Sequence, residues 1–320
     1  MKKQIIPGLT YPFHDLRNSK AEAIEQESQK WLSKDYVVMP DEFNRKTQNY
    51  KYHHTHVGYM AARMYPFASF EKLKPITRFL LWGLINDDLY ENSPVNEIQN
   101  VRDRSIATLR GFSLQPRDNS LLMQLKVQRE EMLNHMPMYW MNRYINSIDK
   151  GFEGMQLEAY YKSNMIFPTI EDYVTIREKA VLVYPLIDLC ELQAGHALPD
   201  RIFYHPVIQH LASLVCKIIA FANDYFSVEK EREKDVMNIV LILEHQFGLS
   251  TTDAYLKAIS MHDDNVSAFC KTANELPDFG TCSHLVKRLI DNIGILITGH
   301  RSWYEKDTHR YVDQRASGNK

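Results

Sequence analysis

An apolar helical segment that places three oxygen-bearing side chains on one face constrains this chain more than any other feature. Asn223, Ser227 and Glu231 are spaced four and four apart, and each step of four residues turns an α-helix by only about 40°. An amide, a hydroxyl and a carboxylate in a row form an all-oxygen ligand set that suits Mg²⁺. A second acidic cluster, Asp87-Asp88-Leu89-Tyr90-Glu91, lies upstream. Two such patches on separate helices can clamp several Mg²⁺ ions and a polyphosphate between them.

The composition excludes several classes of protein. Glycine (12) and proline (13) are sparse in 320 residues, which favours helices over a turn-rich β architecture. A net charge of −2 argues against a nucleic-acid partner. No run of about 18 apolar residues predicts a membrane span, and the N-terminus lacks the apolar region of a secretory signal. We expect a cytoplasmic protein with reduced, buried cysteines: Cys190, Cys216, Cys270 and Cys282.

Helical periodicity covers almost the whole chain and predicts an all-α fold. We expect helices at Ala21–Leu32, His53–Met64, Pro75–Leu89, Thr251–Leu276 and His284–Glu305. Three longer patterns should each contain a break: Asn119–Lys150 at Pro137, Thr169–Ala194 at Pro185, and His205–Gln246 near Asp235. Pro75 occupies a helix-start position in this interpretation. With no linker or repeat, residues 1–320 are expected to form one domain, with residues 312–320 as a frayed tail.

Carboxylates at the end of an apolar helix indicate an apolar cavity with a charged mouth. Burying unpaired carboxylates costs several kcal/mol, so such clusters persist where a cation or water meets them. The acidic cluster alone is weak evidence, because D-D-x-x-E is common at solvated helix ends. The N-D-x-x-S-x-x-x-E pattern is more specific, and Lys230 within it could reach a phosphate. A di-iron bundle would need paired E-x-x-H motifs, and the sequence has no fitting pair.

The chain resembles the bacterial-type class I terpene synthases over most of its length. Asp87-Asp88-Leu89-Tyr90-Glu91 resembles the family's aspartate-rich motif, and Asn223, Ser227 and Glu231 fall on its asparagine-serine-glutamate triad. The segment Ala61-Ala62-Arg63-Met64-Tyr65-Pro66 resembles the stretch ahead of the aspartate-rich helix. Trp303, Thr308, Arg310 and Tyr311 match the terminal W…T-x-R-Y pattern. The family also places a pyrophosphate-sensing arginine 46 residues before the triad asparagine, and here that residue is Arg177.

The resemblance implies roles for individual residues. The implied metal ligands hold three Mg²⁺ ions, with Mn²⁺ as an alternative, and are Asp87, Asp88, Glu91, Asn223, Ser227 and Glu231. The implied diphosphate-binding residues are Arg177, Lys230, Arg310 and Tyr311. Val181 is implied as the effector, acting through its backbone carbonyl. Trp82, Trp303 and Phe221 are the aromatic candidates for stabilising a carbocation.

Two residues depart from the family pattern. Asn86 stands where an aromatic or aliphatic residue is usual, which would place a polar group near the cavity. Ala180 replaces the polar residue that often links the sensor to the effector.

The implied activity is cyclisation of a linear isoprenyl diphosphate with release of pyrophosphate, farnesyl diphosphate being the first choice and geranylgeranyl diphosphate the second. The same fold also supports chain-elongating prenyltransferases, but these need a second aspartate-rich motif in place of the triad. A catalytically inactive protein that only binds isoprenoid diphosphates is a further alternative. Family members are frequently homodimers, although nothing in this chain identifies an interface.

Overall fold

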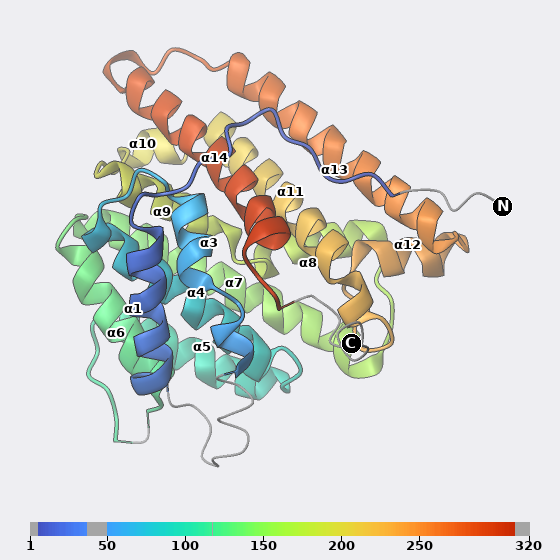
Figure 1. Ribbon diagram of the computed structural model, residues 1–320, viewed down its shortest axis with the longest axis horizontal. Coiled ribbons are helices and arrows are strands. Elements are labelled where there is room, and N and C mark those ends of the chain that lie inside the picture. The colour runs from blue at the N-terminus through green and yellow to red at the C-terminus, as the bar shows by residue number, and fades with distance from the viewer. Residues whose placement is uncertain (1–5, 37–49, 117, 311–320) are drawn as a thin grey trace.

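The computed structural model describes residues 6–36, 50–116 and 118–310, and within these residues every regular element is a helix (Figure 1). The first half contains α1 (Ala21–Lys34), α3 (Val57–Met64), α4 (Phe70–Tyr90), α5 (Val95–Leu109), α6 (Ser120–Leu133) and α7 (Met138–Asn164). The second half contains α8 (Ile170–Ala180), α9 (Val183–Ala194), α10 (Asp200–Phe203), α11 (Pro206–Glu231), α12 (Ile239–Phe247), α13 (Thr251–Asn274), the 3-10 turn η1 (Gly280–Cys282) and α14 (Ser283–Lys306). The all-α prediction is confirmed. The predicted tail at 312–320 lies outside the described residues.

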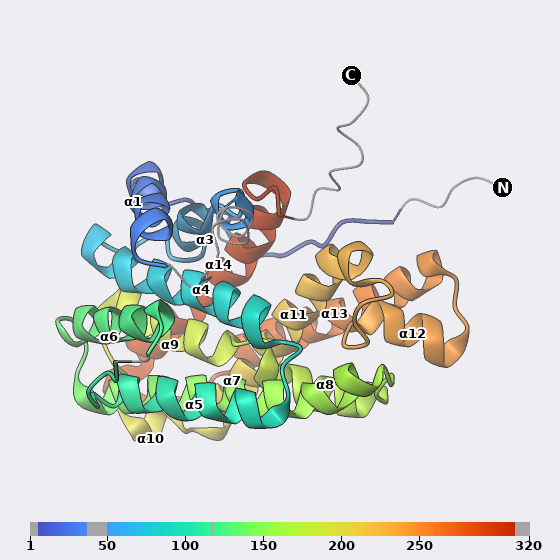
Figure 2. The same ribbon diagram turned by 90° about the horizontal axis from the view of Figure 1, so that it is seen from below.

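Helix α4 lies inside the bundle, with helices packed on both of its sides. α1 and α3 contact it on one side and α6 on another, while α5 and α7 pack together beyond α6 (Figure 2). α11 is similarly enclosed, because α13, α14, α8, α9 and α12 all contact it. The two helices that carry the oxygen-rich motifs are therefore held by packing on several faces, which fixes their relative positions.

α11 is apolar because it is a core helix. By length and composition it could cross a membrane, but 72% of its most apolar window is buried inside the protein. Among the described residues, no other helix passes that test. The buried residues include Val215, Ile218 and Ile219 on the side facing the centre of the bundle.

A segment that precedes the first helix, residues 6–16, runs across the bundle beside α13 and α14, and we call it the N-terminal strap (Figure 1). Arg301 on α14 donates to the carbonyl of Leu9 at 2.9 Å, and the Tyr11 hydroxyl is 2.9 Å from Nε2 of His262 on α13. The Phe13 ring packs where a side chain at Gly294 would lie, since a Cβ there would be 2.7 Å from Cδ1 of Phe13. The strap is thus joined to the last two long helices.

Several boundaries differ from the sequence prediction. α4 begins at Phe70, so Pro75 lies inside the helix rather than at its start. Proline is tolerated there at the cost of the hydrogen bond that its missing N–H would have donated. The helix predicted from His53 begins at Val57, because His56 adopts a left-handed conformation with φ 54°. α5 and α10 were not predicted. α5 buries few of its residues, so its apolar periodicity is weak in the sequence.

The predicted breaks at Pro137 and near Asp235 are confirmed, but the break assigned to Pro185 is wrong in position. The chain leaves α8 at Val181 and turns through Leu182, which has φ 57°. Pro185 is the third residue of α9, where a missing N–H costs nothing because first-turn N–H groups have no helical partner.

The turn at Leu182 packs tightly against α7. An ideal Cβ on Gly154 would lie 2.3 Å from the backbone nitrogen of Ala180, so only glycine allows this approach.

Candidate active site

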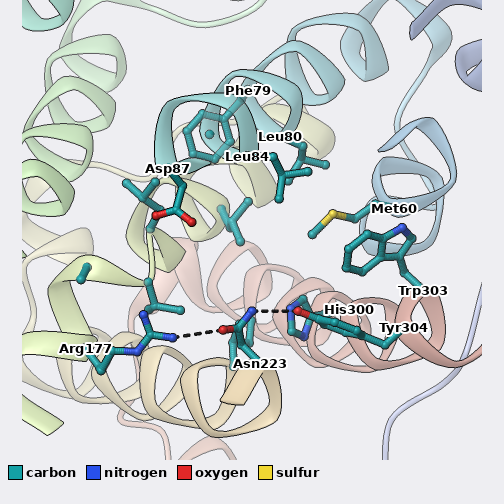
Figure 3. Close-up of a pocket in the computed structure, with 16 residues that line it drawn as sticks. Met60, Phe79, Leu80, Leu84, Asp87, Arg177, Asn223, His300, Trp303 and Tyr304 are labelled. Carbon is teal, nitrogen blue, oxygen red and sulfur yellow. Dashed lines mark hydrogen bonds between the residues drawn. The ribbon is translucent and has the colours of Figure 1, made fainter. Parts of the chain in front are cut away.

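The central cavity lies between α3, α4, α8, α9, α11 and α14, and has a volume of about 150 Å³. One part of its wall is apolar, with Met60, Phe79, Leu80, Leu84, Leu186 and Ile219 among the lining residues (Figure 3). Asp87, Arg177 and Asn223 supply the polar part of the wall. An apolar cavity with charge gathered on one part of its wall is the arrangement that the sequence predicted.

The cavity face of α4 is a stripe with helical spacing. Asp87 lies on it with the residues four, seven and eight positions before, which are Gly83, Leu80 and Phe79. Trp82 is five positions before Asp87, and five residues rotate a helix by about 140° from the starting side. Its ring therefore points to the other side of α4, where it packs edge-on against Phe152 at 6.0 Å. Placing Trp82 in the cavity was wrong, and Phe79 is the aromatic residue that α4 contributes.

Asn86 shares the outer face of α4 with Trp82. Its side chain is buried, with Nδ2 3.8 Å from Sδ of Met155 on α7. The expectation that Asn86 puts a polar group near the cavity is therefore also wrong. The two residues line a separate, polar pocket of about 460 Å³ against α5 and α6.

Phe221 does not reach the cavity either. It lies two residues before Asn223, a rotation of about 160° from the cavity side. Its ring stacks on Tyr173 of α8 at 6.1 Å, within the apolar cluster that α8, α11 and α12 share. Ile219, four residues before Asn223, occupies the cavity position instead.

Trp303 and Val181 do line the cavity. Trp303 is fully buried and held in place by a 2.8 Å hydrogen bond from its Nε1 to the carbonyl of Thr55. Val181 caps the C-terminus of α8, beside the left-handed turn at Leu182. Ala180 lies next to it in the same wall, so residue 180 offers no polar side chain to link Arg177 to Val181.

The triad follows the expected helical spacing along α11. Oδ1 of Asn223 accepts a hydrogen bond from Arg177 at 3.1 Å, and its Nδ2 donates to the Tyr304 hydroxyl at 2.7 Å (Figure 3). The Ser227 hydroxyl is buried and has no hydrogen-bond partner among the described residues. One oxygen of Glu231 accepts from Asn238 at 2.8 Å. Burial raises the pKa of Glu231 to about 7.

These groups fit a divalent cation. A nearby Mg²⁺ would give the buried hydroxyl oxygen the partner that it lacks. It would also stabilise the charge of the buried carboxylate. Within the described parts of the chain, no three His, Cys, Asp or Glu side chains converge closely enough to hold a metal. A cation at the triad would therefore use the amide and hydroxyl oxygens of Asn223 and Ser227 in addition to the Glu231 carboxylate.

The acidic residues of α4 divide between two surroundings. Asp87 opens onto the cavity while protein surrounds it, and this desolvation raises its pKa, against the opposing charge of Lys162. Desolvation, reinforced by the negative charge of Asp87, raises the pKa of Glu91 to about 7. At both carboxylates the nearby positive charge does not offset burial, so a bound cation would stabilise their ionised forms.

Asp88 points away from Asp87 and is already saturated with donors. Arg310 contacts its Oδ1 at 2.9 Å, and both Lys51 and the Tyr52 hydroxyl contact its Oδ2 at 2.7 Å. Burial opposes the charge of Asp88, but Arg310 and Lys51 outweigh that effect and lower its pKa. In this arrangement Asp88 positions Arg310 near the mouth. Tyr311, its predicted partner, lies outside the described residues.

Arg177 joins three helices at the polar end of the cavity. It contacts Asp224 Oδ1 at 2.9 Å and Asn223 Oδ1 at 3.1 Å on α11, and Glu158 Oε1 at 3.3 Å on α7. Asp224 is fully buried and also accepts from the backbone nitrogen of Ile239 at 2.7 Å. The residue predicted at a distance of 46 positions from Asn223 is thus in direct contact with it.

A lysine that the sequence analysis missed connects the two motifs. Lys162 on α7 lies 3.4 Å from Glu158, 3.2 Å from Asp235 and 3.9 Å from Glu91. It therefore bridges the end of α4 and the loop after α11. Lys230, by contrast, has an exposed side chain next to Glu231, and its charge helps to lower the pKa of Glu91 against burial.

Other site residues were also missed. Tyr304 and His300 line the cavity from α14, four residues apart, and Asp224 lies within the N-D-x-x-S motif itself. Helical spacing from Trp303 could have indicated His300, three positions earlier. No motif marks Glu158 or Lys162, because their role depends on the packing of α7 against α4 and α8.

A helical bundle with an apolar cavity, a triad on one wall and acidic residues on the other is a class I terpene synthase architecture. The sequence model described as "Terpene synthase family 2, C-terminal metal binding" matches residues 78–268. The chain belongs to this family and is a class I terpene synthase of the bacterial type.

Curated relatives match along nearly the full length of the chain. Germacrene A synthase of Nostoc punctiforme is 26% identical over 308 residues, covering 95% of this chain and 92% of the relative. A (+)-T-muurolol synthase ((2E,6E)-farnesyl diphosphate cyclizing) of Roseiflexus castenholzii is 24% identical, covering 92% and 90%. Among solved structures, 2-methylisoborneol synthase of Streptomyces coelicolor, in complex with Mg²⁺ and 2-fluoroneryl diphosphate, superimposes with a TM-score of 0.82. It is 18% identical and covers 97% of this chain and 98% of that one, so it supports the fold.

Proposed function

We propose that this terpene synthase is a Mg²⁺-dependent sesquiterpene cyclase that converts farnesyl diphosphate to a cyclic hydrocarbon or alcohol and releases pyrophosphate. The observation that carries the proposal is the placement of Asn223 and Arg177 across the cavity from Asp87, with an apolar wall beyond them. The preference for farnesyl over geranylgeranyl diphosphate rests on relatives named as sesquiterpene or farnesyl diphosphate cyclases.

Asp87 and Glu91 from α4 and the triad on α11 would hold the ions, of which we propose three, with Mn²⁺ as a substitute. Bound Mg²⁺ supplies Lewis-acid neutralisation of the leaving diphosphate. Arg177 donates bidentate hydrogen bonds to that diphosphate, and Arg310 approaches it from the mouth. Arg177 must first exchange Asn223 and Asp224 for the diphosphate oxygens, which makes its displacement a response to substrate binding.

The apolar wall then controls the fate of the carbocation. Phe79 and Trp303 line the cavity with aromatic rings, and the faces of such rings stabilise cations through their quadrupole. Aliphatic residues such as Leu80 and Leu84 hold the chain in a folded conformation and exclude water, which would otherwise capture the cation early. We further propose that residues 1–320 form one cytoplasmic domain.

The proposal is tested with purified protein, Mg²⁺ and, separately, geranyl, farnesyl and geranylgeranyl diphosphate, with extracts read by gas chromatography–mass spectrometry. A cyclic C15 product is expected. A cyclic C20 product would replace the substrate assignment, and no product from any substrate would favour a binding protein.

Alanine variants test the metal site itself. Asn223→Ala and Glu231→Ala should abolish turnover while the helical circular dichroism spectrum is retained. Glu229→Ala is the matched control, because Glu229 is an exposed carboxylate on the same helix. Retained turnover in both triad variants would refute the metal assignment.

A further inference from the structure

His300 on α14 lines the cavity, and its ring makes no hydrogen bond to any described residue. Its side chain is 4% exposed and lines the cavity beside Trp303 and Tyr304 (Figure 3). Nδ1 is buried without a hydrogen-bond partner among the described residues. Its ring contact is edge-on to Tyr304, with centroids 5.1 Å apart. A buried polar atom left unpaired costs about 1–3 kcal/mol, so packing alone does not account for this histidine.

Another buried histidine shows what a structural role looks like in this fold. His262 on α13 is 1% exposed, and both of its ring nitrogens have partners: the Tyr11 hydroxyl at 2.9 Å and the Asp263 carboxylate at 2.9 Å. His300 has neither kind of contact. The two residues therefore form a matched pair in which only one faces the cavity.

The position of His300 along α14 is on the side of the cavity where the hydrocarbon part of a substrate would lie. Tyr304 is at the level of the triad, because it bonds to Asn223, and Arg310 lies further along the chain towards the mouth. His300 precedes Tyr304 by four residues, which is about 6 Å along the helix axis and away from that mouth. Ile219 is displaced from Asn223 by the same four residues along α11.

The surroundings of His300 keep its imidazole neutral. Burial lowers its pKa to about 4, so at neutral pH one ring nitrogen retains an unprotonated lone pair. A carbocation loses a proton far more readily than an imidazolium ion does. Even this weak base is therefore strong enough to deprotonate a carbocation that is held against it.

We propose that His300 is the catalytic base that ends the cyclisation by removing a proton from the final carbocation. The step breaks a C–H bond next to the cationic carbon, and the electron pair of that bond forms the C=C double bond of the product. The proton bonds to the ring nitrogen lone pair and leaves for solvent when the cavity opens to release the olefin. This inference rests on the proposed function and makes the principal product a hydrocarbon.

The experiment compares His300→Phe and His300→Gln with wild type on farnesyl diphosphate and Mg²⁺, measuring pyrophosphate release and the product mixture separately. We expect pyrophosphate release to stay within about threefold, because ionisation precedes the proton transfer. The share of the wild-type olefin should fall by at least about tenfold, as expected for loss of a general base. Alcohols formed by water capture of the carbocation, and isomeric olefins formed by loss of other protons, should replace it. His300→Gln serves if the phenylalanine variant fails to fold.

His262→Gln is the control and should leave the product mixture unchanged. If the His300 variants are active and give the wild-type product mixture, this inference is overturned and the proposed function is not. A wild-type product consisting only of alcohols, or a covalent terpenyl adduct on His300 found by mass spectrometry, would also overturn it. A wild-type protein that releases no pyrophosphate from farnesyl diphosphate would instead overturn the proposed function, and this inference with it.

Discussion

Replacing Gly154 by alanine should damage the enzyme from a position that does not face the cavity. An ideal Cβ at this residue would lie 2.3 Å from the nitrogen and 2.6 Å from the Cα of Ala180, where ordinary contacts begin at 3.4 Å. The obstacle is backbone, which cannot rotate away as a side chain can. The end of α8 must therefore move by about 1 Å relative to α7.

The magnitude follows from two opposing effects. Overpacking in a core costs about 1–3 kcal/mol, and replacing glycine by alanine within a helix returns about 1 kcal/mol. We expect a net loss of up to about 2 kcal/mol, seen as a fall in Tm of at most a few degrees. The effect on turnover should be larger. Arg177 and Val181 belong to the displaced segment, and a shift of about 1 Å in a catalytic arrangement can reduce kcat about 100-fold.

Gly151→Ala is the matched control. Its Cβ would lie 2.1 Å from Cδ2 of Leu182, the end of a flexible side chain that can change rotamer. We expect kcat within about fivefold of wild type and an altered product mixture, because Leu182 lines the cavity. Thermal unfolding, steady-state pyrophosphate release and product analysis of both variants test the argument. Wild-type Tm and kcat in Gly154→Ala would refute it.

Three further predictions concern hydrogen bonding and pH. Tyr304→Phe removes the hydroxyl that orients Asn223 and should weaken apparent Mg²⁺ affinity about tenfold; a metal titration followed by Tm measures it, and unchanged affinity would exclude this role. Because burial raises the pKa of Glu231 to about 7, Mg²⁺ must displace a proton below that pH, so the Tm increase with Mg²⁺ should be larger at pH 8 than at pH 6. Burial also raises the pKa of Asp188 to about 7, against the opposing effects of Ser147 and of the positive charges of Arg143 and Lys150. Its stabilising protonation is present at low pH and lost as pH rises through 7, so the Tm of Asp188→Asn minus that of wild type should increase from pH 4 to pH 8; a constant difference would contradict the pKa shift.

The features that were predictable from the sequence are those encoded by spacing within one helix or between motifs. The triad lies on one face of α11 because residues four apart must do so. The 46-residue distance to Arg177 correctly indicated a residue in contact with Asn223. The all-α class followed in the same way from periodicity and from scarce glycine and proline.

The errors in placing side chains at the cavity have a common physical origin, which is rotation about a helix axis. Trp82, Asn86 and Phe221 were placed by their closeness in sequence to a ligand, although five, one and two residues turn a helix by about 140°, 100° and 160° away from that ligand. Counting back from Asp87 by four and eight would have found Gly83 and Phe79. The break at Leu182 was missed because a left-handed non-glycine residue has no composition signal, whereas proline is conspicuous.

The ion pairs at the mouth could not be derived from sequence at all. Lys162 contacts carboxylates from three different segments. Which lysine among many does so depends on how α7 is placed against α4 and against the loop after α11. That placement is decided by close approaches such as the one at Gly154, which no local pattern reports.

The N-terminal strap has a consequence for how the protein is made. Residues 6–16 leave the ribosome well before two of their partners: Tyr11 meets His262, and Leu9 meets Arg301. The contacts of Tyr11 and Leu9 with α13 and α14 can form only after more than 250 further residues have been synthesised, so they carry a high loop-closure cost and form late. Until then, apolar side chains of the strap itself, such as Leu9 and Phe13, lack the surface that covers them in the folded protein.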